Sequence, residues 1–240
     1  MDMILVISVL LAFIVKGMSG FANTLVFGTL MSFNTNTINI TPVDLLLGFP
    51  TNMLIVYKER KSLDPKVYVP LSILVVLGII PGAFFLKNGD TQVIKLIFGI
   101  VVALISLEMF LRDKQVHQRK SSRFVLIGIG IVSGILCGLF GVGAFLVAYI
   151  SRTTTNMKQF RGNICAVFLV ENIFRIILYS MTGILSVSIF IECIKLIPVV
   201  IVGLSIGIFL SNKFSEKIIK NIVIVVLLLS GISLVINNIV

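Results

Sequence analysis

Few residues in this sequence could do chemistry, and those that could are charged groups inside long apolar stretches. Glu171 and Arg175 are four positions apart, so on a helix they share one face and can form an ion pair. Lys16 follows an apolar run near the N-terminus. A charge in the hydrocarbon of a bilayer costs about 2.5 kcal/mol or more unless it is paired or hydrated. These groups therefore need a charged partner or a charged ligand.

Two glycine-rich segments, Lys16–Asn23 and Cys137–Gly143, are the second candidate feature. Glycine permits a positive φ and a close approach of backbones. A helix that begins after such a turn presents free N–H groups and the positive end of its dipole, which favour an anion. The alternative is that the small residues only allow close helix packing. The solute-binding residues predicted in these segments are Lys16, Gly17, Gly20, Asn23, Gly138, Gly141 and Gly143.

Asn52 and Asn172 extend this predicted binding site. Both fall near the middle of apolar stretches, where an unpaired amide is unfavourable, so each is predicted to contact the solute or the opposite glycine-rich segment. Arg175 is a further candidate anion ligand, and Glu171 is then the proton-coupling residue. A purely structural Glu171–Arg175 pair remains open, as does a pairing of Lys16 with Glu171.

Nothing in the sequence resembles a nucleophile–base pair or a nucleotide-binding loop. The three cysteines, Cys137, Cys165 and Cys193, lie in apolar segments without CxxC spacing, and His117 is in a basic loop. We therefore expect no catalytic residue, no metal site and no cofactor, and we predict that the protein is not an enzyme.

The bulk composition sets the class of protein. Hydrophobic residues make up 58% of the 240 positions and charged residues 12%, with a mean hydropathy of +1.13. A soluble domain carries about 25% charged residues. Apolar runs of about 20 residues, the length that crosses a bilayer core, follow one another with short breaks. Because a spanning segment must satisfy its own backbone hydrogen bonds, the sequence predicts an all-α, multi-pass membrane protein.

The net charge of +10 does not indicate a nucleic-acid partner, because the basic residues gather in short clusters between the apolar runs. This is the positive-inside pattern of a chain whose partner is a lipid bilayer. The predicted apolar stretches are Met3–Val15, Ala22–Phe33, Pro42–Tyr57, Val67–Leu86, Val93–Leu111, Phe124–Leu136, Ala144–Ile150, Ile164–Met181, Ile189–Leu210 and Ile218–Ile236.

The two halves of the chain match at nearly constant shifts. The least expected matches are those of Gly17 with Gly138, Gly20 with Gly141, Asn52 with Asn172, Gly78 with Gly203, Gly82 with Gly207 and Lys95 with Lys220. We predict an internal duplication, with a first repeat at 1–111, a cytoplasmic linker at 112–123 and a second repeat at 124–240. The Gly78-xxx-Gly82 and Gly203-xxx-Gly207 pairs are predicted to pack helices within one chain or between copies in a homodimer.

Charge also predicts how the repeats are oriented. If each glycine-rich break is a re-entrant hairpin, all the basic loops face the cytoplasm. Each repeat then adds a broken helix pair to three transmembrane helices, and the odd number of crossings inverts the second repeat. A kinked helix that crosses fully through each break is the alternative, and it places the loops around Arg152–Arg161 and Lys213–Lys217 outside.

The run from Gly138 through Gly141 and Gly143 to Val147 resembles the TauE/SafE family of sulfite exporter-type permeases, as does the run Met157–Asn163. Ala144 and Asn23 stand where that family usually has a further glycine. The resemblance covers the whole chain and implies a cytoplasmic-membrane carrier for small anions, sulfite or organosulfonates among them, driven by the proton-motive force. The leading hypothesis is a secondary transporter that exports a small anion; the alternative is a non-transporting membrane scaffold.

Overall fold

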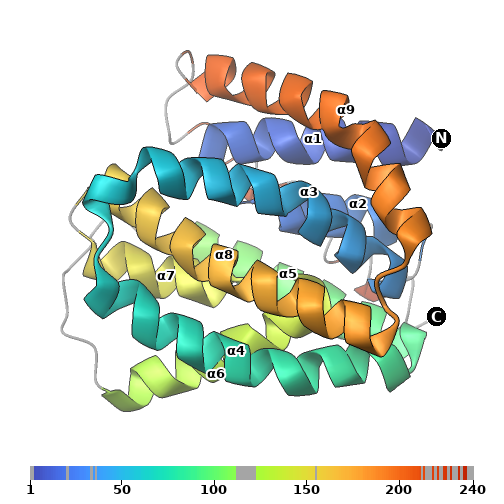
Figure 1. Cartoon of the computed structure of the whole chain (residues 1–240), viewed down its shortest axis with the longest axis horizontal. Coiled ribbons are helices and arrows are strands. Elements are labelled where there is room, and N and C mark those ends of the chain that lie inside the picture. Colours follow the sequence, from blue (N-terminus) through green and yellow to red (C-terminus); the bar gives the residue numbers. More distant parts are fainter. Residues whose placement is uncertain are drawn as a thin grey trace. The chain divides into compact units, whose positions relative to one another are not determined.

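The structure is a computed structural model that describes residues 3–19, 22–32, 35, 37–111, 123–154, 156–211 and 213, with isolated positions beyond. All regular structure in these residues is helical, which confirms the predicted all-α class (Figure 1). The elements are α1 (Met3–Ser19), α2 (Asn23–Ser32), α3 (Thr37–Lys58), η1 (Arg60–Ser62), α4 (Pro65–Asn88), α5 (Thr91–Leu111), α6 (Arg123–Phe140), α7 (Ala144–Thr153), α8 (Met157–Thr182) and α9 (Val187–Ser211).

Four described helices are long and apolar enough to cross a membrane. They cover Ile38–Lys58, Pro65–Asn88, Lys158–Thr182 and Val187–Leu210, and shorter apolar helices cover Met3–Met18, Thr91–Leu104 and Leu126–Phe140. These helices agree with the multi-pass membrane protein predicted from hydropathy. Most of the predicted stretch Ile218–Ile236 and of the linker 112–123 lies outside the described residues.

Both glycine-rich breaks are shorter than predicted. Helix α1 continues through Lys16 and Gly17 to Ser19, and α6 continues through Gly138 to Phe140. At 17 and 18 residues they rise about 25 and 27 Å, close to the ~30 Å of a bilayer core, so their length does not distinguish a hairpin from a full crossing. The helices continue because Gly17 and Gly138 pack against neighbouring helices, and such glycines are tolerated within membrane helices.

The chain forms two compact units. Unit 1 comprises Met1–Leu47, Gly89–Asp113 and Val187–Val240; unit 2 comprises Gly48–Asn88 and Lys114–Ser186. Each unit mixes the two predicted repeats, because α1 packs along α9 in unit 1 and α4 packs along α6 in unit 2. The boundary between the units falls inside α3, between Leu47 and Gly48.

Glycines bring the backbones of these two helix pairs together. A Cβ atom on Gly17 of α1 would lie 2.7 Å from the Leu204 carbonyl oxygen and 2.9 Å from the Gly207 Cα of α9. In unit 2, a Cβ atom on Gly138 of α6 would lie 2.6 Å from the Ile79 carbonyl oxygen and 3.1 Å from the Gly82 Cα of α4. No side chain larger than hydrogen fits at these positions.

The Gly78-xxx-Gly82 and Gly203-xxx-Gly207 faces are therefore used inside the chain. Gly78 lies against Gly134 of α6, and Gly203 lies against Leu10 and Phe13 of α1. This confirms the packing prediction within one chain, and the structure gives no support to a homodimer formed through these glycine faces. Because successive glycines contact successive turns of the partner helix, α4 and α6 run in the same direction, and so do α1 and α9.

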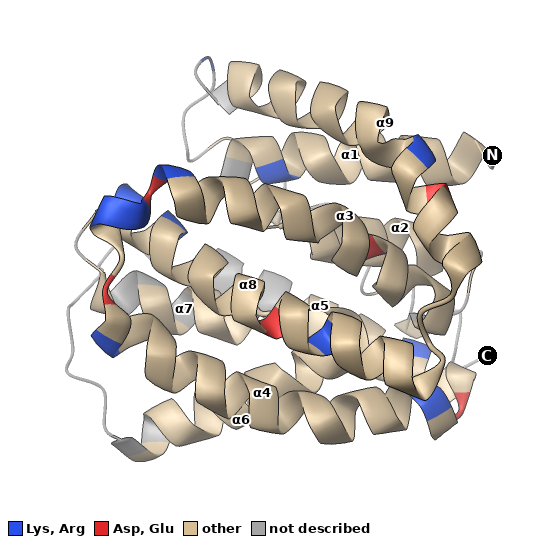
Figure 2. Ribbon diagram, viewed as in Figure 1, with Lys and Arg blue, Asp and Glu red and all other residues tan. Residues whose placement is uncertain are grey.

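One end of unit 2 is basic. Figure 2 shows Lys and Arg at the turn between α3 and α4, whereas the bodies of the helices are largely uncharged. The start of α8 lies at this same end, because the Asn163 Oδ1 accepts a hydrogen bond of 2.9 Å from the backbone N–H of Asp64. A Cβ atom on Gly162 would meet the Leu63 side chain at 3.1 Å. Helices α4 and α8 thus begin at the same end of unit 2.

Candidate functional site

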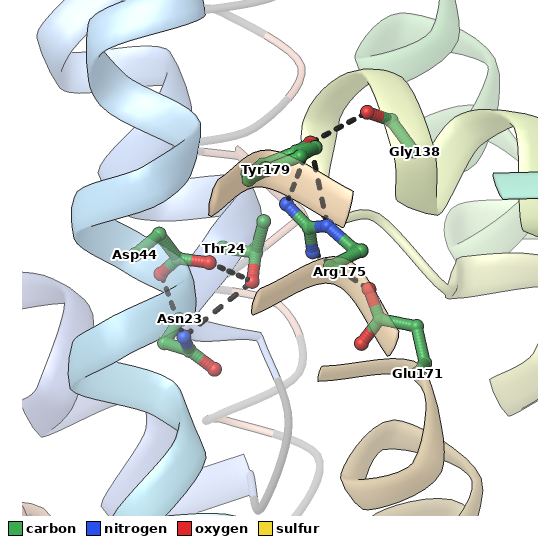
Figure 3. Close-up of polar contacts among 7 residues, drawn as sticks. All are labelled: Asn23, Thr24, Asp44, Gly138, Glu171, Arg175 and Tyr179. Atoms are coloured by element: carbon green, nitrogen blue, oxygen red, sulfur yellow. Dashed lines mark hydrogen bonds and ion pairs between the residues drawn. The ribbon is translucent and has the colours of Figure 1, made fainter. Parts of the chain in front are cut away.

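The predicted ion pair on α8 is present and fully buried. Arg175 Nη1 lies 2.6 Å from Glu171 Oε1, and both residues are only 2% exposed (Figure 3). Spacing by four residues places them on one helix face, as the sequence predicted. A buried guanidinium can present the rest of its fork of N–H donors to an oxyanion, provided that the anion can reach it.

Tyr179, which sequence reasoning missed, completes this cluster. Its hydroxyl oxygen accepts hydrogen bonds from Arg175 Nε at 3.3 Å and Nη2 at 3.2 Å, and its O–H donates to the Gly138 carbonyl at 2.6 Å (Figure 3). That carbonyl belongs to the last turn of α6, where carbonyls have no partner within the helix. Tyr179 thus connects the buried cation of α8 with the end of the broken helix. Its position four residues after Arg175 was the signal available in the sequence.

The second break has the geometry that its glycines predicted. Gly141 adopts φ +74°, and its N–H donates to the Cys137 carbonyl at 2.9 Å, which ends α6. Gly143 precedes the first residue of α7 and provides no capping side chain. A Cβ atom at Gly143 would collide with the Phe168 ring of α8, so glycine is required there for packing. Unit 2 thus brings together Gly138, Arg175 and the turn that contains Gly141.

Unit 1 has its own polar cluster, centred on Asp44 of α3. Asn23 Nδ2 donates to Asp44 Oδ1 at 2.8 Å, and Thr24 Oγ1 donates to Asp44 Oδ2 at 2.6 Å (Figure 3). The predicted residue Asn23 is therefore in a buried polar network at the start of α2. Sequence reasoning missed Asp44 although it is an acidic residue within the predicted apolar stretch Pro42–Tyr57, which was itself the available signal.

Lys16 and the remaining predicted residues are distributed over both units. Lys16 is 3% exposed, and its Nζ lies 5.7 Å from the centre of the Phe13 ring. Lys16 belongs to unit 1 and Glu171 to unit 2, and the pairing of the two stays a prediction. Gly17 packs against α9 rather than forming the turn, and Gly20 lies outside the described residues.

Asn52 and Asn172 are both 5% exposed, on α3 and α8 respectively. Both side chains are thus buried. Their predicted contacts with the solute or the opposite break stay predictions. The three cysteines are reduced and buried.

Comparison with known proteins decides the family. The family described as sulfite exporter TauE/SafE matches residues 5–234, nearly the whole chain. The chain belongs to this family. The TauE/SafE proteins are membrane transporters, so this chain is a membrane transporter and not an enzyme, and the resemblance seen in the sequence is confirmed. No curated protein and no solved structure matches it.

Proposed function

We propose that this TauE/SafE protein is a secondary transporter that exports a small anion, such as sulfite or an organosulfonate, across the cytoplasmic membrane. The observation that carries the proposal is the Arg175 guanidinium, which lies buried in a membrane helix beside a glycine-broken helix. Ionisable residues within membrane segments are costly and typically mark the path of a substrate or ion. The family membership supports an anion as the solute.

Arg175 is the proposed anion ligand in unit 2. Its planar fork of donors matches the oxygen atoms of a sulfite or sulfonate group as it matches a carboxylate. Glu171 Oε1 accepts from one nitrogen of this fork, Arg175 Nη1, at 2.6 Å. An arriving anion would replace Glu171, and Glu171 would then take up a proton, since a displaced, buried carboxylate is costly when ionised. This exchange gives Glu171 its proposed role in proton coupling.

Lys16 is the proposed anion ligand in unit 1. It is buried in the last turn of α1, close to the first break. A buried ammonium adds a positive charge that an anionic solute can neutralise. Gly20, Asn52 and Asn172 remain proposed contributors, on the grounds of their sequence positions and, for the two asparagines, their burial.

The contacts in unit 2 support the re-entrant hairpin and the inverted repeats. The basic loop Lys58–Lys66 and the start of α8, which carries Lys158 and Arg161, lie at the same end of unit 2. A full crossing through the second break would put these basic segments on opposite sides of the bilayer. In unit 1, α2 packs back against α1, which also favours a hairpin.

The proposal is tested by solute flux into proteoliposomes, with a panel of sulfite, sulfoacetate, taurine and other small anions. We expect at least one of these anions to move only when the protein is present. Absence of flux and of binding for the whole panel would overturn the proposal.

A substitution then tests the role of Lys16. We expect Lys16→Met to abolish anion binding while the protein remains folded, because the buried positive charge is removed. Lys87→Met is the matched control, since Lys87 lies exposed at the end of α4 and should bind the anion unchanged. Unchanged affinity of Lys16→Met would remove Lys16 from the site.

A further inference from the structure

Asp44 is a buried carboxylate in a membrane helix to which the proposed anion site gives no role. It lies seven residues after the start of α3, about 10 Å into the helix, and is 6% exposed. An acidic residue at such a position in a membrane protein indicates an ion or proton site by default. The geometry of its hydrogen bonds with Asn23 and Thr24 indicates which kind of ligand fits.

Asn23 and Thr24 can both keep their hydrogen bonds to Asp44 when it takes up a proton. When Asp44 is ionised, Asn23 Nδ2 donates to Oδ1 at 2.8 Å and Thr24 Oγ1 donates to Oδ2 at 2.6 Å. A threonine hydroxyl is both a donor and an acceptor. When Oδ2 is protonated, it can therefore donate to Thr24 Oγ1 across the same distance, while Asn23 continues to donate to Oδ1.

Glu171 differs from Asp44 in this respect. Its Oε1 accepts from Arg175, and a guanidinium has five N–H donors and no acceptor. Protonation of Glu171 would leave the buried Arg175 cation without its counter-charge. The hydrogen bond between Thr24 and Asp44 can therefore reverse its direction on protonation, whereas the bond between Arg175 and Glu171 cannot.

We propose that Asp44, with Asn23 and Thr24, is a proton-binding site of the anion-free transporter, and that this proton is coupled to anion movement. The coupling rests on the proposed function. Asn23 and Thr24 are the first two residues of α2, directly after the first break. The positive end of the α2 dipole attracts an ionised Asp44 more strongly than a neutral one. Proton binding to Asp44 therefore changes the strength of the interaction between α3 and α2, the helix that follows the first break.

Other titratable groups of unit 1 are alternative proton acceptors that the test must distinguish from Asp44. Those with described side chains on the helices of unit 1 are Lys16 on α1, Lys95 on α5, and Glu192, Cys193 and Lys195 on α9. Cys193 packs beside the backbone next to Asp44, because its thiol donates to the carbonyl of Val43 at 3.8 Å. α2 carries no titratable side chain.

The test is infrared difference spectroscopy of the full-length protein in lipid nanodiscs, between neutral and acidic pH and without transportable anions. We expect the wild type to show the C=O band of a protonated, buried carboxyl group. The band should be lost in Asp44→Asn, which preserves the shape of the side chain, and kept in Glu171→Gln and Cys193→Ser. A band that persists in Asp44→Asn, or that disappears only in Glu171→Gln, would overturn the proposal.

A second variant covers the case in which Asp44→Asn does not fold. Thr24→Val keeps the carboxyl group but removes the hydroxyl that receives its proton, so the band should shift in frequency. An unshifted band would contradict the role of Thr24 and with it the proposed site.

Sulfite flux under an imposed pH gradient tests the coupling. The gradient should accelerate flux in the wild type and accelerate it less in Asp44→Asn, in which Glu171 is the remaining proposed coupling residue; an equal acceleration in both would overturn the coupling. If no anion moves even in the wild type, the proposed function fails, and the infrared band still decides whether Asp44 binds a proton.

Discussion

A single hydroxyl group connects the buried cation of this transporter with its broken helix. Tyr179 accepts from two nitrogens of Arg175 and donates to the Gly138 carbonyl, so that a change at the guanidinium reaches the last turn of α6 directly. The Tyr179 ring also faces the guanidinium, with 5.0 Å between the ring centre and Arg175 Cζ. At the scale of residues, Tyr179 is therefore a positioning residue for the proposed anion ligand.

Tyr179→Phe is expected to weaken both the fold and the site. It leaves the Gly138 carbonyl without its hydrogen bond, which costs roughly 1–3 kcal/mol for a buried group. We expect a lower thermal unfolding temperature and, because Arg175 loses two contacts, weaker sulfite binding than the wild type at temperatures where both are folded. Tyr57→Phe is the control, since Tyr57 is 68% exposed and should change neither property. Wild-type affinity in Tyr179→Phe would show that Tyr179 has only a structural role.

At the scale of elements, α4 and α6 pack closely because each helix carries glycines one turn apart on the face that meets the other. Gly78 and Gly82 on α4 face Gly134 and Gly138 on α6. Without a hydrophobic driving force between helices in lipid, close backbone contact of this kind stabilises their association. The α1–α9 pair in unit 1 uses Gly17 and Gly207 at the matching positions.

Gly82→Ala is expected to destabilise the α4–α6 pair. The added Cβ would collide with the backbone carbonyl of Ile135, and backbone atoms cannot move aside cheaply. Overpacking of this kind costs about 1–3 kcal/mol, measured as a loss of thermal stability in detergent. Gly207→Ala should behave in the same way in the α1–α9 pair, where the Cβ would meet the Ile14 carbonyl.

Gly128→Ala is the matched control for these two substitutions. Gly128 lies on α6 with no atom within 4 Å of an added Cβ. An alanine in the helix interior is favoured over glycine by up to about 1 kcal/mol, so its stability should be equal or higher. Equal stability of all three variants would contradict the importance of the glycine contacts.

At the scale of the whole molecule, each compact unit contains helices from both predicted repeats. Unit 1 combines α1, α2 and α5 with α9, and unit 2 combines α4 with α6, α7 and α8. The matched glycine contacts in the two units are what a duplicated, intertwined chain would produce. The separation into repeats at 1–111 and 124–240 stays a prediction from the sequence, whereas the compact units follow the helix pairs.

The proposed orientation predicts how cysteine substitutions react with a membrane-impermeant thiol reagent. With the native cysteines replaced, Lys61→Cys and Lys158→Cys should be modified only from the cytoplasmic side, because both belong to the basic end of unit 2. Ser186→Cys, after the far end of α8, should be modified only from outside. The hairpin arrangement is contradicted if Lys158→Cys is modified from outside while Lys61→Cys is modified from inside.

The sequence by itself determined the membrane class, most helical segments, the common helix face of Glu171 and Arg175, and the family. These follow from local quantities: hydropathy over about 20 residues and spacing along one helix. The ends of the glycine-rich breaks were predicted poorly, since a glycine such as Gly17 or Gly138 is equally consistent with a turn and with helix packing. The helices that pack against such a glycine decide whether it forms a turn or a packing contact.

Tertiary structure alone decided the partners of the buried polar groups. Tyr179 meets Gly138 across 41 positions, and Asp44 meets Asn23 across 21, and no local pattern encodes either contact. The same holds for the assignment of α9 to α1 and of α6 to α4, which depends on glycines far apart in the chain. Hydropathy fixes which segments enter the membrane, but in lipid it does not select their neighbours, because association there depends on close packing and on the pairing of polar groups.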